Sequence, residues 1–258
     1  MIEQLERVEF HVVTPSYRRP TDVKAAYLVR GMKIVVRPEE EAVYRENYPD
    51  VELVVMDRGV TGLSNTRQWI YEHFGNVFMV DDDVVRVSRL YMIDKAPPEL
   101  TPDEAYELIQ YTGNMARAAG CYLFGFNPNP SSLIYNPFNP IRLSGYIPGY
   151  SLGLVKGSKL YFDPTFVSTD DYFISALNAY HHRMCWKDTR FCFEPKDNFE
   201  KAGGVAAYRT MDTEKQDTLN LARMFGDVVR LKGVTGMGKK GANRVAGIEY
   251  SRTLQIPF

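Results

Sequence analysis

Four short apolar runs in the first third of the chain, each followed by a turn or a helical segment, limit the fold most strongly. They are apolar at nearly every position, as strands buried on both faces of a sheet are. Segments 21–30 and 39–48 and a helix through Trp69 and Ile70 to His73 separate them. This alternation predicts an α/β fold with a mostly parallel sheet and helices on both faces. The four runs are Phe10–Val13, Ile34–Val36, Leu53–Met56 and Val77–Val80.

The remainder of the chain changes character. Residues 102–119 predict a helix that opens with a capping box of Thr101 and Glu104. Residues 121–163 are rich in Gly, Pro, Asn and Tyr and predict short strands and long loops. A helix over 169–181, a strand over 190–194 and a helix over 212–226 follow. We expect one domain: a nucleotide-binding half (about 8–100), an acceptor half (about 101–229) and a basic, Gly-rich C-terminal segment (about 230–258).

Composition narrows the class of protein. The chain has 258 residues and a formal net charge of −1, whereas a protein that grips nucleic acid over its whole surface is usually basic. Its three cysteines suit a reducing compartment and are too few for a disulfide framework. No apolar run approaches the ~20 residues of a membrane helix, and the N-terminus has no signal-peptide core. These features predict a cytoplasmic protein without a membrane partner.

Three consecutive aspartates directly follow the run Val77–Val80. In open α/β sheets ligands bind at the carboxyl ends of the strands, and three adjacent carboxylates need a positive partner. Hard divalent cations bridge carboxylates to phosphates. We therefore predict that Asp83 and Asp81 hold Mn²⁺ or Mg²⁺. Asp81 and Asp82 are predicted to contact the donor, Asp81 through a ribose or sugar hydroxyl. An acidic turn exposed to solvent is the alternative.

The loop after the first run, with the sequence TPSYRRP, should lie at the same edge of the sheet as the aspartates. Thr14 and Pro15 are predicted donor contacts there. Tyr17 is predicted to stack on a nucleobase, and Arg18 or Arg19 to pair with phosphate through the planar guanidinium. The alternative is a surface turn with two solvated arginines.

Arg67 follows a glycine-containing loop, one turn into the helix after the third run. Backbone N–H groups at a helix start favour anions, so Arg67 is predicted to point at the nucleotide. An exposed arginine behind a helix cap is the alternative.

The ordered set of TPSYRRP, RPEE, SNTRQWI and FMVDDDV, each after or within a predicted strand or helix, resembles the nucleotide half of GT-A glycosyltransferases. It is most similar to a bacteriophage family, the TET-associated glycosyltransferases. The resemblance covers about residues 8–90 well. It implies a nucleotide-diphosphate sugar donor, such as a UDP-sugar, and transfer of the sugar to 5-hydroxymethylcytosine in phage DNA, within the host cytoplasm.

A second pair of carboxylates opens the helix predicted over 169–181. Inverting GT-A enzymes keep an acidic residue at the start of a comparable helix, where it takes the proton of the acceptor hydroxyl. By this resemblance Asp171 is the predicted catalytic base and Asp170 the second choice. Aspartate is also a favoured N-cap without any catalytic role.

The basic C-terminal segment contains Lys239 and Lys240 within the sequence GMGKKG. This is not a P-loop, because the spacing and the terminal Ser or Thr are missing. The two lysines are predicted to close over the donor diphosphate. Contact with a DNA backbone and a merely solvated face are the alternatives.

Four functions compete. The first is a glycosyltransferase (hexosyl- or pentosyltransferase) acting on DNA. The second is a glycosyltransferase acting on a small molecule, glycan or protein. The third is a metal-dependent nucleotidyltransferase, against which the absence of glycine from TPSYRRP counts. The fourth is a non-catalytic nucleic-acid-binding module, which the near-zero net charge disfavours.

Overall fold

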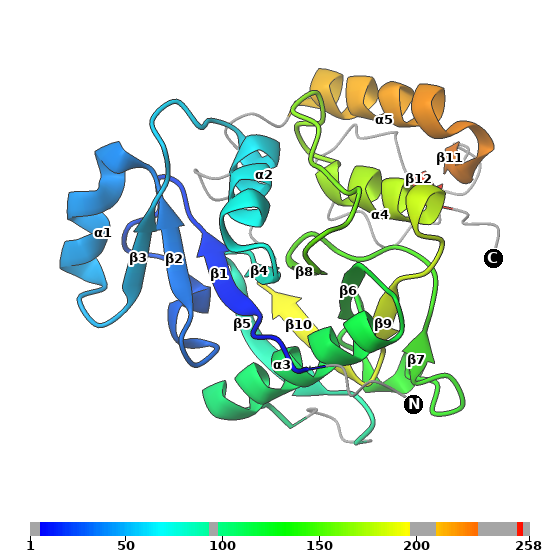
Figure 1. The fold of residues 1–258 in the computed structure, drawn as a ribbon, viewed down its shortest axis with the longest axis horizontal. Helices are drawn as coiled ribbons and strands as arrows, with labels where there is room; N and C mark the ends of the chain where they lie inside the picture. The colour runs from blue at the N-terminus through cyan, green and yellow to red at the C-terminus, as the bar shows by residue number, and fades with distance from the viewer. Residues whose placement is uncertain (1–5, 93–97, 197–209, 232–251, 255–258) are drawn as a thin grey trace.

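An eight-stranded sheet forms the centre of the molecule, with strand order β3-β2-β1-β4-β8-β6-β9-β7 (Figure 1). The computed structural model describes residues 6–92, 98–196, 210–231 and 252–254. Two-stranded ribbons pair β5 with β10 and β11 with β12. The strands are β1 (His11–Pro15), β2 (Lys33–Val36), β3 (Glu52–Val55), β4 (Val77–Val80), β5 (Val84–Arg89), β6 (Leu123–Phe126), β7 (Ile141–Arg142), β8 (Ser151–Leu154), β9 (Trp186–Asp188), β10 (Phe191–Pro195), β11 (Val229–Leu231) and β12 (Arg252–Leu254).

The predicted α/β class and mostly parallel sheet are confirmed. Strands β3, β2, β1 and β4 pair in parallel, as do β6 and β9. β8 lies antiparallel between β4 and β6, and β7 is antiparallel at the edge beside β9. The Gly- and Pro-rich middle of the chain therefore contributes strands to the same sheet, and the two predicted halves share it.

Helices cover both faces of the sheet, as the alternating pattern predicts. Figure 1 shows α2, α4 and α5 on one side and α3 on the other. Among the described residues no helix is long and apolar enough to cross a membrane. The α-helices are α1 (Glu41–Asn47), α2 (Leu63–Phe74), α3 (Pro102–Ala118), α4 (Asp170–His181) and α5 (Met211–Phe225), and the short 3₁₀ turns are Lys24–Tyr27, Pro38–Glu40, Ser132–Ile134 and Gly226–Val228.

Alternate residues of the same strand enter different cores, which explains why the runs are apolar throughout. Val13 and Met79 pack beneath α2 and α4, in a cluster with Ile70. Val12 and Phe78 pack on the opposite face, beneath α3. Both faces of such a strand are buried, which favours apolar side chains at most of its positions.

Two helix predictions fare differently. The capping box of α3 is present, with Thr101 and Glu104 each accepting from the backbone of the other. The helix predicted over 21–30 is wrong, because only the 3₁₀ turn Lys24–Tyr27 forms there. The backbone N–H groups of Lys24 and Ala25 donate to the carbonyl of Asp82, at 2.6 and 3.4 Å. This tertiary contact fixes the segment as a tight turn against the aspartate loop.

The carboxyl ends of β1, β2, β4, β6 and β9 meet at one edge of the sheet, because these strands run in the same direction. The antiparallel strand β8 begins at that same edge, so the loop before it arrives there as well. The amide of Asp81 donates to the carbonyl of Tyr150 over 3.1 Å. The aspartates, the loop after β1 and the loop before β8 therefore converge.

Gly153 is required where β8 crosses the aromatic core. It pairs with Phe78 on one side and Phe124 on the other, and a Cβ there would lie 2.2 Å from the Phe124 ring. We expect Gly153→Ala to lower the free energy of unfolding by about 1–3 kcal/mol through overpacking, measured by urea denaturation. Adding Phe124→Leu should restore part of the loss, because it removes the ring edge. An unchanged urea midpoint for Gly153→Ala would contradict this account.

Candidate active site

A buried arginine ties together three elements at the carboxyl edge of the sheet. Arg67, one turn into α2, is 1% exposed. Its Nη1 donates to Asp170 Oδ2 over 2.5 Å, at the start of α4. Its Nη2 donates to Asp81 Oδ1 over 2.8 Å, after β4, and to the carbonyl of Gly149 over 3.0 Å. The guanidinium thus fixes the distance between the two carboxylate groups that the sequence singles out.

Negative charge exceeds positive charge around Arg67. Burial raises the pKa of Asp170 to about 6; Arg67 opposes this shift, while Asp171 and Asp81 add to it. Burial alone would lower the pKa of Arg67, but Asp170 and Asp81 raise it further than burial lowers it. Arg67 therefore stays charged and does not fully compensate the carboxylates around it.

Asp171 faces a different set of partners from its neighbour Asp170. The Tyr146 hydroxyl donates to its Oδ2, the amide of Gly149 donates to the same oxygen over 3.3 Å, and the amide of Tyr172 donates to Oδ1 over 2.8 Å. The residue is half-buried, whereas Asp170 is 3% exposed and paired with Arg67. Of the two predicted catalytic carboxylates, Asp171 is the more accessible.

Gly149 lets the loop before β8 lie directly against both groups. A Cβ at this position would lie 2.6 Å from Arg67 Nη1 and 3.1 Å from the Cβ of Asp171. Any side chain would displace the guanidinium or the carboxylate. The glycine serves close approach of the backbone here.

The three consecutive aspartates point to different partners. Asp81 turns to Arg67 and keeps 34% of its side chain exposed. Asp82 is buried and accepts from Arg19 Nη1 over 2.7 Å and from Ser16 Oγ over 2.8 Å. Burial raises the pKa of Asp82, and Arg19 and Ser16 oppose the shift. Asp82 therefore fastens the loop after β1 to the end of β4.

Asp83 is the aspartate of this run that has no ion pair within the described part of the chain. Partial burial raises its pKa to about 6, and the charges of Asp81 and Asp82 add to that shift. No three His, Cys, Asp or Glu side chains within the ranges that the structure describes are grouped as a metal site. A Mg²⁺ ion is commonly held by one or two carboxylates together with substrate phosphates and water. Asp83 and Asp81 fit that kind of site.

The loop after β1 carries the predicted donor contacts. Thr14 is buried, and its Oγ1 has no hydrogen-bond partner among the described residues. Pro15 ends β1. The Arg37 guanidinium lies over the Tyr17 ring, with its Cζ atom 3.8 Å from the ring centroid. The Cζ atom of Arg18 lies 5.0 Å from the same centroid. Tyr17 therefore lies beside cationic groups at the edge where the aspartates lie.

Arg18 is exposed and adopts a φ of 57°, in the left-handed region that non-glycine residues rarely enter. Its amide donates to Glu40 Oε1 over 2.9 Å. Arg19, by contrast, already pairs with Asp82. The donor contacts predicted for these residues and for Arg67 stay predictions. Lys239 and Lys240 lie outside the described residues.

A family model described as TAGT, the TET-associated glycosyltransferases, matches residues 10–204, most of the chain. The chain belongs to this family. It is therefore an enzyme, a glycosyltransferase, and the resemblance drawn from its sequence motifs is confirmed. No curated protein matches it.

Solved structures resemble this glycosyltransferase only distantly. A 4-diphosphocytidyl-2C-methyl-D-erythritol synthase from Anaerococcus prevotii is 9% identical with a TM-score of 0.29; the match covers 58% of this chain and 64% of that one. A CMP:2-keto-3-deoxy-manno-octonic acid synthetase complexed with CTP is 9% identical with a TM-score of 0.34, covering 70% and 89%. At these scores neither structure carries an argument about the glycosyltransferase.

The structure adds residues to the site that the sequence did not single out. Asp217 of α5 is 1% exposed and accepts from the amides of Val167 and Ser168, at 3.1 and 2.8 Å, and from Thr169 Oγ1 at 3.3 Å. It holds the segment that leads into Asp170, and Thr169, the N-cap residue of α4, forms no side-chain cap bond of its own. Asp217 lies in an ordinary amphipathic helix, so no local signal marks it.

Arg67 should be essential for the stability of the glycosyltransferase. Arg67→Met leaves Asp81 and Asp170 without their cation, and removal of one partner from a buried pair costs about 3–5 kcal/mol. We expect a correspondingly lower urea midpoint. Arg67→Lys keeps the charge but lacks the forked guanidinium that reaches two carboxylates. Its urea midpoint should therefore lie between those of the wild type and Arg67→Met. The control Arg45→Met removes an exposed i,i+4 pair with Glu41 and should change stability by under ~0.5 kcal/mol. Equal midpoints for Arg67→Met and Arg45→Met would refute this assignment.

Proposed function

We propose that this glycosyltransferase moves a sugar from a nucleotide-diphosphate sugar, such as a UDP-sugar, to the hydroxyl of 5-hydroxymethylcytosine in phage DNA, with Mn²⁺ or Mg²⁺. One observation carries the proposal. Asp83, without an ion pair among the described residues, lies beside Asp81 at the carboxyl edge of the sheet, and Arg67 joins Asp81 to the helix that presents Asp171. The proposed donor site and the proposed base would thereby lie in one place.

Asp83 and Asp81 would hold the metal ion, which stabilises the negative charge of the departing diphosphate when bound. The excess of carboxylates supports this assignment: burial raises the pKa of Asp83, and the charges of Asp81 and Asp82 raise it further, so a further positive charge would be favourable there. Tyr17 and Arg18 would contact the base and phosphates of the donor. Arg19, paired with Asp82, would reach phosphate only through rearrangement of that pair.

Asp171 would act as the general base. The acceptor oxygen forms a bond to the anomeric carbon, the bond from that carbon to the diphosphate breaks, and the hydroxyl proton passes to Asp171. A carboxylate has about four lone-pair positions, so one remains available beside the bonds from Tyr146, Gly149 and Tyr172. Tyr146 and Gly149 would hold the base in orientation.

Asp170 is less suited to this step. Its Oδ2 is taken by Arg67, and the residue is 3% exposed. It would act as a positioning residue, fixing Arg67 and through it Asp81.

Metal dependence is the first test. Asp83→Asn removes one of the two carboxylates proposed as ligands, so we expect transfer to fall at least about 100-fold with an unchanged urea midpoint. EDTA should abolish transfer by the wild type, and added Mn²⁺ or Mg²⁺ should restore it. Asp50→Asn, an exposed aspartate outside the site, is the matched control and should keep full activity. Full activity of the wild type in EDTA would exclude the metal.

The base and the acceptor are tested together. Asp171→Asn should bind the nucleotide diphosphate as the wild type does, measured by calorimetry, and lower kcat by about 10²- to 10⁴-fold. Mass spectrometry should detect added sugar on DNA that contains 5-hydroxymethylcytosine and none on unmodified DNA. Transfer to a sugar or peptide hydroxyl, with none to the modified DNA, would discard the DNA acceptor and leave the glycosyltransferase activity. Wild-type kcat in Asp171→Asn would discard the base.

A further inference from the structure

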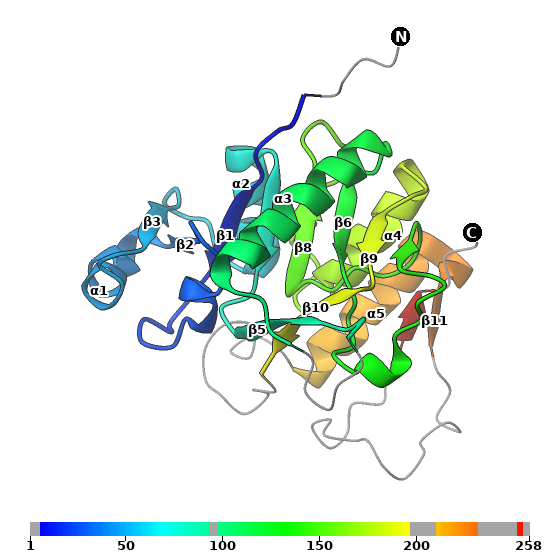
Figure 2. The ribbon, with the colours of Figure 1, turned by 90° about the horizontal axis from the view of Figure 1, so that it is seen from below.

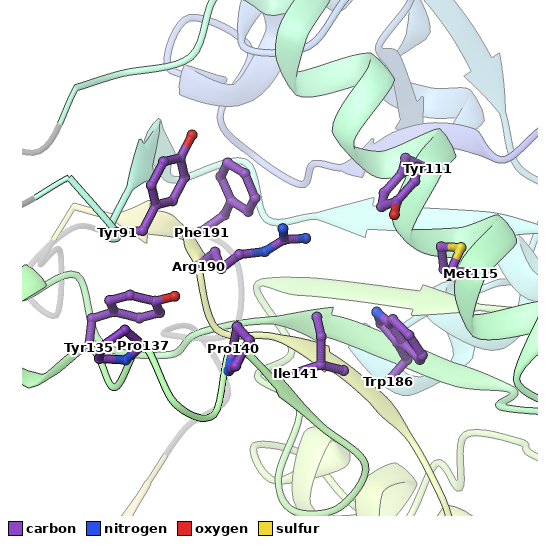
Figure 3. A pocket seen from close by; sticks show the side chains of 10 residues that line it. All are labelled: Tyr91, Tyr111, Met115, Tyr135, Pro137, Pro140, Ile141, Trp186, Arg190 and Phe191. Atoms are coloured by element: carbon purple, nitrogen blue, oxygen red, sulfur yellow. The ribbon is translucent and has the colours of Figure 1, made fainter.

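A concave site lies on the α3 side of the sheet, and its lining includes none of the aspartates of the candidate active site. It is a cavity of about 680 Å³ between α3, β7 and the ends of β9 and β10. This volume lies within the range of about 300–1,000 Å³ typical of ligand pockets. Figure 3 shows its side chains facing a common space. The aromatic and charged members of the lining, here called the aromatic pocket, are Tyr91, Tyr111, Tyr135, Trp186, Arg190 and Phe191.

The aromatic pocket is joined to the candidate active site by one β-ribbon. β5 starts immediately after Asp83 and leads to Tyr91, and β10 returns antiparallel from Phe191 to Lys196, whose amide donates to the Asp83 carbonyl over 3.0 Å. Figure 2 shows this ribbon along the underside of the molecule. The eight residue steps from Asp83 to Tyr91 span at most about 26 Å at about 3.3 Å each. A single extended ligand can therefore reach both places.

The rings of the pocket are available to a ligand. Tyr111 on α3 is 54% exposed and Tyr91 is 45% exposed. Aromatic rings of this size usually pack against other side chains, so these two leave surface for a ligand. Trp186 is half-buried at the start of β9. Aromatic faces that line a groove bind nucleobases by stacking, with little dependence on base identity.

An ion pair with Asp188 holds Arg190 in a fixed position in the pocket, with one guanidinium nitrogen left for a ligand. Its Nε and Nη2 donate to Asp188 at 2.9 and 2.7 Å, and Asp188 is 1% exposed. Nη1 has no hydrogen bond with any residue that the structure describes. Figure 3 shows the guanidinium between Tyr111 and Tyr135, and the hydrogen bond to Asp188 raises the pKa of Arg190. A planar cation of this kind suits a phosphate or the face of a base.

The lining also argues against a carbohydrate. Sugar hydroxyls need acceptors as well as donors, and carboxylates and amides are the side chains that supply them most readily. The residues that line the cavity include no Asp, Glu, Asn or Gln among those described, and the side-chain oxygens there are the hydroxyls of Tyr91, Tyr111 and Tyr135. Rings, prolines and one arginine suit a flat base beside a phosphate better.

We propose that the aromatic pocket stacks an unpaired nucleobase of the DNA acceptor strand, several nucleotides from the modified cytosine, while Arg190 contacts the adjoining phosphate. This proposal rests on the DNA acceptor of the proposed function. It assigns the pocket to the acceptor strand and separates strand binding from the chemical step at Asp171 and Asp83.

Acceptor length tests the proposal. A single-stranded 12-mer with 5-hydroxymethylcytosine at one end spans roughly 40 Å at about 3.4 Å per nucleotide, more than the ~26 Å limit set by the ribbon, whereas a trinucleotide spans only roughly 10 Å. For one of the two strand polarities, the wild type should show a KM for the 12-mer about 5- to 150-fold below that for the trinucleotide, the range expected for one stacked base. Tyr111→Ala should bring the two KM values together at similar kcat.

Two variants serve as matched controls. Tyr111→Phe keeps the ring and loses the hydroxyl, so the preference for the 12-mer should survive. Tyr180→Ala removes a tyrosine that is 68% exposed on α4, on the opposite side of the sheet, and should also keep it. Equal KM values for the two acceptors in the wild type, or an unchanged preference in Tyr111→Ala, would overturn the proposal.

A binding measurement separates this proposal from the proposed function. Fluorescence anisotropy with an unmodified, fluorescein-labelled 12-mer requires no transfer, and Tyr111→Ala should weaken this binding by about 5- to 150-fold. If that loss is seen but no DNA is glycosylated, the pocket assignment stands and the proposed acceptor is wrong. If DNA is glycosylated but the 12-mer binds Tyr111→Ala as it binds the wild type, the pocket assignment is wrong. Tyr111-dependent binding of an oligosaccharide, with none of the 12-mer, also overturns it.

Discussion

The candidate active site depends on one buried guanidinium. Arg67 is 1% exposed and bonded to Asp81, to Asp170 and to the carbonyl of Gly149, so it joins the end of β4, the start of α4 and the loop before β8. A buried charge is tolerated only when it is paired and its donors are used. Each of the three segments is therefore constrained by the same side chain. A shift of any one segment would leave a buried polar or charged group without its partner.

The antiparallel strand β8 makes this arrangement possible. Because it runs against β4 and β6, it begins at the edge where those strands end, and the loop before it delivers Gly149 and Tyr146 to Asp171. A parallel strand would end at this edge instead, and the loop before it would lie at the opposite one. Gly153 permits the strand to pass between Phe78 and Phe124. The same strand thus completes the aromatic core and the candidate active site.

The two candidate binding regions differ in the kind of interaction that they offer a ligand. Around Asp83 the carboxylates exceed the cations, an arrangement that favours a bound cation. The aromatic pocket has flat rings and one arginine fixed by Asp188, which favours stacking. The ribbon of β5 and β10 connects them through main-chain hydrogen bonds. A long polymeric acceptor is the kind of ligand that could engage both.

The sequence by itself determined the parallel part of the sheet, the two-sided core, the capping box of α3 and the position of the aspartates at a strand end. These follow from local periodicity and from the rule that parallel strands end together. Even the loose motif set around SNTRQWI and FMVDDDV was enough to indicate the family. Local patterns are reliable where the physical cause is also local.

The tertiary structure decided what each charged residue does. Arg67 and Asp170 are 103 positions apart, and Asp217 holds the segment before α4 from 49 positions away. Among three adjacent aspartates, only packing determined that Asp81 meets Arg67, that Asp82 meets Ser16 and Arg19, and that Asp83 has no ion pair within the described residues. The aromatic pocket likewise gathers side chains from α3, β9 and β10 and from the loops after β5, before β7 and after β9. A side chain's partners depend on long-range packing, and the local sequence carries no record of it.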